Sequence, residues 1–156
     1  MGLDMYLTGE KFFTGFDKPR AQEDGFEVEA HTLKLGYWRK HPNLHGYIVT
    51  TFADGVDECQ EINLGADDIR RIITAIEARE LPHTEGFFFG ASDDSKEERK
   101  RDVEVFTKAL AWLEDVKKPV ERKPEPMGAG MATIKIEPGD YDGVTEMRSV
   151  IYRASW

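Results

Sequence analysis

Two histidines four residues apart, His41 and His45, have the types and spacing that most readily suggest chemistry in this chain. On a helix this spacing places both imidazoles on one face, where they can bind a single metal ion. The set is incomplete, because Pro42 follows His41 and no glutamate lies between the histidines, as it does on a zinc-protease helix. A third ligand would have to come from elsewhere in the chain: His31, His83, Cys59 or a carboxylate. We therefore expect no metal site.

An anion site is the second interpretation of the same stretch. Arg39 and Lys40 directly precede an expected helix start, where unpaired N–H groups and the helix dipole attract negative charge. Tyr37 and Trp38 would stack on a base or cover the apolar edge of a ligand. Basic residues, aromatic residues and a helix start thus converge here, which predicts a ligand site that also includes His41 and His45.

A structural interpretation of this stretch remains open. Consecutive strand residues point to opposite faces, so at least one of Tyr37 and Trp38 packs in the core. His41 or Asn43 then closes the start of the helix.

The sequence "LPHTEGFFFG" is the second candidate segment. His83, Thr84 and Glu85 would supply polar contacts beside an aromatic wall that begins at Phe87. The alternative is that the three adjacent phenylalanines, 87–89, form a buried strand and the polar residues only connect it to its neighbours.

The recognised catalytic motifs are not found. "GFFFGASDD" lacks the spacing and ending of a phosphate-binding loop, and no Gly-x-Ser-x-Gly segment occurs. No nucleophile or metal set for a hydrolase can be assembled from sequence alone. We therefore expect a binding function without catalysis and without a cofactor.

Periodicity predicts the elements that position these residues. Apolar residues alternate in four expected strands, and three segments have helical spacing. The strands are 2–9, 26–38, 58–65 and 149–156, and the helices are 41–55, 66–80 and 95–118. Segments 11–25 and 81–95 are expected loops. The predicted fold class is α+β: a single domain over 1–156 with a mostly antiparallel sheet packed by about three helices.

Proline and glycine mark a further segment. Residues 119–147 are expected to form an exposed loop or insertion, which includes a short strand at its "MATIKIEPGDYDG" end.

Composition limits the partners. The net charge of −9 disfavours nucleic acid as a partner and suits docking on a basic partner or mimicry of nucleic-acid charge. Cys59 is the only cysteine, which suits a reducing cytoplasm, and no apolar run approaches the ~20 residues of a membrane helix. Edge strands at both ends leave pairing into a homo-oligomer open.

Four blocks in this order resemble a group of small proteins encoded by bacteriophages and prophages: "MGLDMYL", "LGYWRKHPNLHGYI", "ELPHTEGFFFG" and the ending "YRASW". Members sometimes carry the label phosphoglycerate kinase, but 156 residues without a phosphate-binding loop cannot hold that two-domain enzyme. The segment 119–147 departs from the group.

The resemblance implies an accessory protein acting in the cytoplasm of an infected bacterium. It would bind a small anionic molecule, such as a nucleotide or a nucleotide-derived signal, and sequester it from host defence. The alternative is an acidic interaction module that inhibits a host protein.

Overall fold

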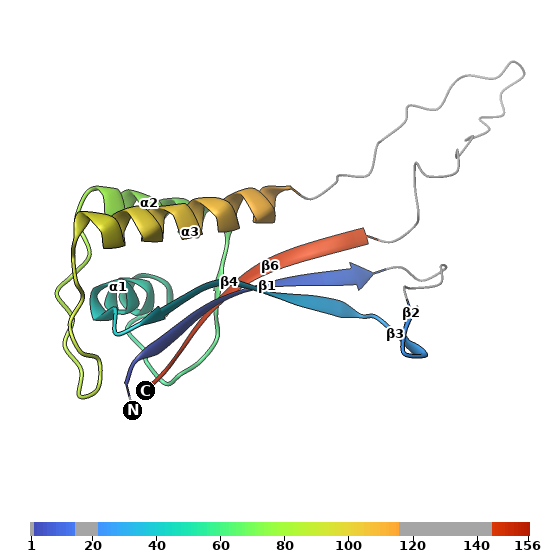
Figure 1. The fold of residues 1–156 in the computed structure, drawn as a ribbon, viewed down its shortest axis with the longest axis horizontal. Helices are drawn as coiled ribbons and strands as arrows, with labels where there is room; N and C mark the ends of the chain where they lie inside the picture. The colour runs from blue at the N-terminus through green and yellow to red at the C-terminus, as the bar shows by residue number, and fades with distance from the viewer. Residues whose placement is uncertain (1, 15–21, 116–144) are drawn as a thin grey trace, which may run out of the picture.

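A four-stranded antiparallel sheet organises the chain, in the order β4-β1-β6-β5. The computed structural model describes residues 2–14, 22–115 and 145–156. The strands are β1 (Asp4–Thr14), β4 (Ala30–Arg39), β5 (Ile62–Leu64) and β6 (Thr145–Ser155). The first and last strands pair along their whole length at the centre of the sheet, so the two ends of the chain lie side by side (Figure 1).

Three helices pack against one face of this sheet (Figure 1). They are α1 (Pro42–Phe52), α2 (Ala66–Glu77) and α3 (Lys96–Glu114). The helix expected at 66–80 is found as α2, and the helical spacing of its isoleucines forms a buried stripe, because Ile69, Ile72 and Ile76 are fully buried. The α+β prediction is therefore confirmed. No helix in the described part of the chain is both long enough and apolar enough to cross a bilayer.

The alternation of the central strands separates a buried face from an open one. Leu3, Met5 and Leu7 are completely buried under the helices, whereas Tyr6 between them is 40% exposed. β6 follows the same pattern, with Val150 and Tyr152 inward. An antiparallel sheet tolerates this arrangement because its backbone hydrogen bonds are satisfied within the sheet while one face meets water. The predicted alternation of both strands is confirmed.

The boundaries of several elements differ from the sequence predictions. Residues 11–14 were expected in a loop but continue β1, where they pair with β6. The expected strand 58–65 is reduced to β5. In the segment 119–147, the last three residues belong to β6, so the loop prediction is wrong there. The rest of that segment, 119–144, lies outside the described residues, as do residues 116–118 of the expected third helix.

The expected strand 26–38 is divided. Its first residues form β3 (Phe26–Glu27), which pairs with β2 (Gln22–Glu23) as a short hairpin, and the rest belongs to β4. The hairpin turn consists of Asp24 and Gly25, with φ of 51° and 85°. Positive φ at both central residues is what a two-residue hairpin turn requires, and an Asp–Gly pair adopts it readily.

Candidate functional site

His41 lies at the start of α1, where it joins three distant parts of the chain. It is 3% exposed. Its Nδ1 lies 2.8 Å from the Ser92 hydroxyl, and its Nε2 lies 2.8 Å from Oδ2 of Asp102 on α3. The other oxygen of Asp102 accepts a 2.7 Å hydrogen bond from the Trp38 indole N–H. The fully buried carboxylate is thus bonded at both oxygens, as a charge in a low-dielectric interior requires.

Ser92 also completes the start of α1. The His41 side chain makes no capping hydrogen bond to its own helix, and Pro42 has no N–H to satisfy. The next N–H, that of Asn43, donates to the Ser92 hydroxyl at 3.1 Å. The Asn43 side chain in turn accepts from the Thr84 N–H at 3.0 Å. The loop between α2 and α3 is therefore fastened to the start of α1 at two points.

His45, one turn further along α1, has a similar set of partners. Its Nδ1 lies 2.7 Å from the Tyr152 hydroxyl and its Nε2 lies 2.9 Å from Oδ2 of Asp57. The rings of Phe89 and Trp156 pack against it, with centroids 5.2 and 5.9 Å away. Burial raises the pKa of Tyr152 well above its usual value, and the nearby charge of Asp57 adds to the effect.

These contacts leave the two histidines occupied by protein groups. Each of the four ring nitrogens lies within hydrogen-bond distance of a hydroxyl or a carboxylate. Within residues 2–14, 22–115 and 145–156, no group of three or more His, Cys, Asp or Glu side chains is arranged to hold a metal ion. The geometry of α1 therefore offers no support for the metal interpretation.

The predicted ligand residues on β4 point to opposite sides of the sheet. Trp38 is 1% exposed and stacks on Phe106 in the core, so its ring is not presented to a ligand. Tyr37 is 41% exposed on the open face. The structure thus separates Tyr37 and Arg39 from Trp38, His41 and His45, although all five were expected in one ligand site.

Tyr37 belongs to an aromatic and charged group on the open face. Its ring lies 5.4 Å from that of Tyr6, and the Lys34 ammonium lies 4.9 Å from its centroid. Its hydroxyl donates a 2.6 Å hydrogen bond to Asp4, which raises the pKa of Tyr37. Arg39 lies 4.0 Å from the same carboxylate. The two residues of the predicted site that reach this face are therefore held in place by Asp4.

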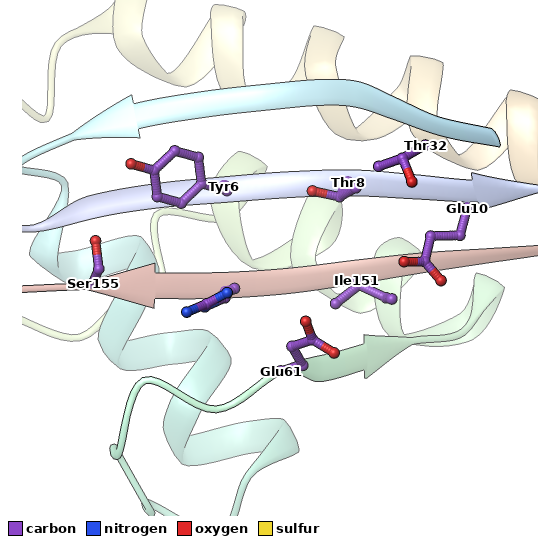
Figure 2. A pocket seen from close by; sticks show the side chains of 8 residues that line it. Tyr6, Thr8, Glu10, Thr32, Glu61, Ile151 and Ser155 are labelled. Carbon is purple, nitrogen blue, oxygen red and sulfur yellow. The ribbon is translucent and has the colours of Figure 1, made fainter. Parts of the chain in front are cut away.

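A pocket of about 490 Å³ opens on this face beside the tyrosine pair. Figure 2 shows the Tyr6, Thr8 and Glu10 side chains rising from β1, with Ile151 and Ser155 on β6. The remaining lining residues are Thr32, Glu61 and Arg153. We call this set of eight residues the open-face pocket. Its volume falls within the range of roughly 300–1,000 Å³ that is usual for small-molecule sites.

Strand register places the basic and aromatic residues of this face in adjacent rows. Tyr6 is the cross-strand partner of both Tyr37 on β4 and Arg153 on β6. The neighbouring row pairs Asp4 with Arg39 and Ser155. Directly opposed residues in a sheet have side chains within contact range, so both tyrosines and both arginines border a single patch.

The second predicted segment lies elsewhere. His83 and Glu85 are exposed and pair with each other at 3.1 Å, and Phe87 is 92% exposed. Thr84 packs against α1, where a β-carbon on Gly46 would overlap its side chain. Among the described residues, no hydrogen bond, ion pair or ring contact joins His83, Thr84 or Phe87 to the open-face pocket. The alternative of a buried phenylalanine strand is wrong, because residues 87–89 form a turn in which Phe89 alone is buried.

Lys40 also departs from the expected site. It has a positive φ of 57°, and its aliphatic stem lies beside Gly2 and Gly90. It lies between the end of β4 and the turn formed by residues 87–89, away from the Tyr6–Tyr37 pair.

Sequence reasoning missed Asp102, Ser92, Tyr6 and Arg153. Asp102 lies in the charged stretch "EERKRD", a pattern typical of a solvated helix face. Alternation alone places Tyr6 and Arg153 on the outward faces of their strands. It does not show that these two strands pair at the centre of the sheet. Comparison with known proteins yields no match to a family model, a curated protein or a solved structure.

Proposed function

We propose that this protein binds a small anionic molecule carrying a flat ring, of the nucleotide class, in the open-face pocket. The observation that carries the proposal is the adjacency of the Tyr6–Tyr37 pair and Arg153 at the mouth of a pocket of about 490 Å³. An aromatic ring offers a stacking surface, and a guanidinium forms charge-assisted, two-pronged hydrogen bonds to phosphate.

The charges around the pocket support a defined orientation of the ligand. Arg39 and Arg153 flank the tyrosine end, whereas Glu10 lies four residues beyond Tyr6 along β1. Carboxylates accept hydrogen bonds from hydroxyl and amino groups but repel phosphate. The phosphate therefore lies at the arginine end, and the sugar hydroxyls or base amines of the ligand point toward Glu10.

This proposal changes the residues that the sequence suggested. Tyr37 and Arg39 keep their roles in binding, and Tyr6 replaces Trp38 as the second stacking surface. Binding does not require His41, His45, His83, Thr84, Phe87 or Lys40. The proposal concerns binding rather than turnover, as the sequence analysis expected.

The resemblance to phage- and prophage-encoded proteins supports a biological setting for this activity. In an infected bacterium, a protein that holds a nucleotide-derived signal lowers its free concentration and delays the defence that it triggers. Both the setting and the sequestration remain proposals, independent of the binding chemistry.

Fluorescence anisotropy with methylanthraniloyl-ADP tests the binding. We expect saturable binding by the full chain, weakened about tenfold or more by Arg153→Ala, because one charge-assisted hydrogen bond contributes about 1.5–3 kcal/mol. Tyr6→Ala should weaken it similarly. Lys100→Ala is the matched control, since it removes an exposed cation from α3 on the helical side of the sheet. Absence of binding, or equal affinity of the Arg153→Ala and Lys100→Ala variants, contradicts the proposal.

A further inference from the structure

Ser92, His41 and Asp102 form a continuous chain of hydrogen bonds that runs from the loop surface into the core. Ser92 is half-buried in the loop between α2 and α3, His41 begins α1, and Asp102 is fully buried on α3. Both links measure 2.8 Å. We call these three residues the serine relay. It lies on the helical side of the sheet, so it is independent of the open-face pocket.

The partners of the relay fix the direction of its hydrogen bonds. A carboxylate only accepts, so the His41 Nε2–H donates to Asp102. In the neutral imidazole Nδ1 then carries the lone pair, and the Ser92 hydroxyl donates to it. The Trp38 N–H, 2.7 Å from the other carboxylate oxygen, holds Asp102 in this orientation. The proton of Ser92 thus faces a base whose opposite nitrogen is anchored by a buried charge.

We infer that Ser92 is a base-activated nucleophile that reacts with activated acyl esters and with organophosphorus electrophiles. A hydroxyl becomes nucleophilic when an adjacent base removes its proton as the new bond forms, and a third group orients that base. Ser92 is the nucleophile, His41 is its base, and Asp102 is a positioning residue that orients His41. Here the hydroxyl meets Nδ1 and the carboxylate meets Nε2, and either imidazole nitrogen can act as the base when the other carries the proton.

The reaction with an ester balances as follows. Ser92 Oγ forms a bond to the carbonyl carbon while its proton passes to His41 Nδ1. The bond between carbon and the leaving alkoxide breaks, and the alkoxide takes that proton from His41. Water then attacks the acyl group by the same route, releasing a carboxylic acid and restoring the Ser92 hydroxyl.

The geometry at Ser92 leaves one lone pair for this attack. Its oxygen has two lone pairs, and one accepts the Asn43 N–H at 3.1 Å. That hydrogen bond also gives Ser92 a structural role as the cap of α1. Capping α1 requires only the Ser92 oxygen as an acceptor, whereas the inferred activity also requires the neutral imidazole of His41. An experiment can therefore separate the two roles.

Labelling of the full chain with diisopropyl fluorophosphate tests the inference. In this reaction the Ser92 oxygen bonds to phosphorus, the phosphorus–fluorine bond breaks, and the proton leaves through His41 with fluoride. Ser95 is the internal control, because it is a similarly half-buried serine of the same loop that caps α3 at 3.0 Å and has no imidazole partner. General-base assistance contributes about a hundredfold or more. We therefore expect peptide mapping to find Ser92 labelled at least about a hundredfold faster than Ser95.

Labelling of two variants distinguishes reaction at the serine relay from incidental reactivity of a serine hydroxyl. Ser92→Ala should abolish the label at unchanged secondary structure, and Asp102→Asn should slow it, because an amide that donates to Nε2 moves the ring proton to Nδ1. Equal labelling of Ser92 and Ser95, or no labelling of either, overturns the inference. The Ser92-to-Ser95 ratio is measured on the unmodified chain, so it does not depend on any variant folding.

Discussion

The indole N–H of Trp38 donates a 2.7 Å hydrogen bond to the fully buried carboxylate of Asp102. This contact ties the edge strand β4 to the long helix α3, and the second oxygen of the carboxylate extends it to His41 at the start of α1. One acidic side chain on α3 therefore joins this helix to β4 and α1, which lie about 60 residues earlier in the chain.

Asp102→Ala should lower the free energy of unfolding by about 3–5 kcal/mol, because it leaves Trp38 and His41 without their buried partner. Urea denaturation followed by circular dichroism measures this. Glu104→Ala is the control, since Glu104 is exposed on the same helix and its pair with Lys100 spans 4.0 Å. Its effect should stay within about 0.5 kcal/mol. Equal effects of the two substitutions would show that the buried network does not stabilise the fold.

Contact between Gly46 and Thr84 should make α1 intolerant of a larger residue. A β-carbon at Gly46 would lie 2.8 Å from the Thr84 β-carbon, well inside van der Waals contact. Gly46→Ala should therefore cost about 1–3 kcal/mol despite the higher helix propensity of alanine.

The double variant Gly46→Ala with Thr84→Gly separates this clash from other effects. It should recover part of the loss, because removing the Thr84 side chain makes room for the new methyl group. Thermal unfolding of the single and double variants checks it. A Gly46→Ala protein as stable as the parent would mean that the loop does not pack on α1 as described.

Stability should fall at alkaline pH through Tyr152. Its pKa is raised in the folded state by burial and by Asp57. The contribution of Tyr152 to stability is thus complete below the pKa of an unfolded tyrosine, about 10, and is lost as the pH rises above it. Urea unfolding between pH 9 and 11 should show a steeper loss for the parent than for Tyr152→Phe. Identical slopes would contradict the raised pKa.

The fold was largely predictable from sequence because its signals are local. Alternation identified β1 and β6, and the isoleucine spacing identified α2, since these patterns need only one buried face. Asp102 could not be found in this way, because a charged residue is buried only when distant partners such as Trp38 and His41 compensate it. Only part of the candidate site was predictable, because the rest depends in the same way on contacts between distant residues. Tyr37 and Arg39 were found on β4, but Tyr6 and Arg153 required knowledge of which strands pair.

The most direct test of the central claim is a map of ligand-induced chemical shifts in the ¹⁵N-labelled full chain titrated with ADP. Binding in the open-face pocket predicts saturable shifts of the Tyr6, Thr8, Ile151 and Arg153 amides, with little change along α3. No saturable shift, or shifts confined to residues 83–87 and the start of α1, would contradict the account and place any ligand on the helical side of the sheet.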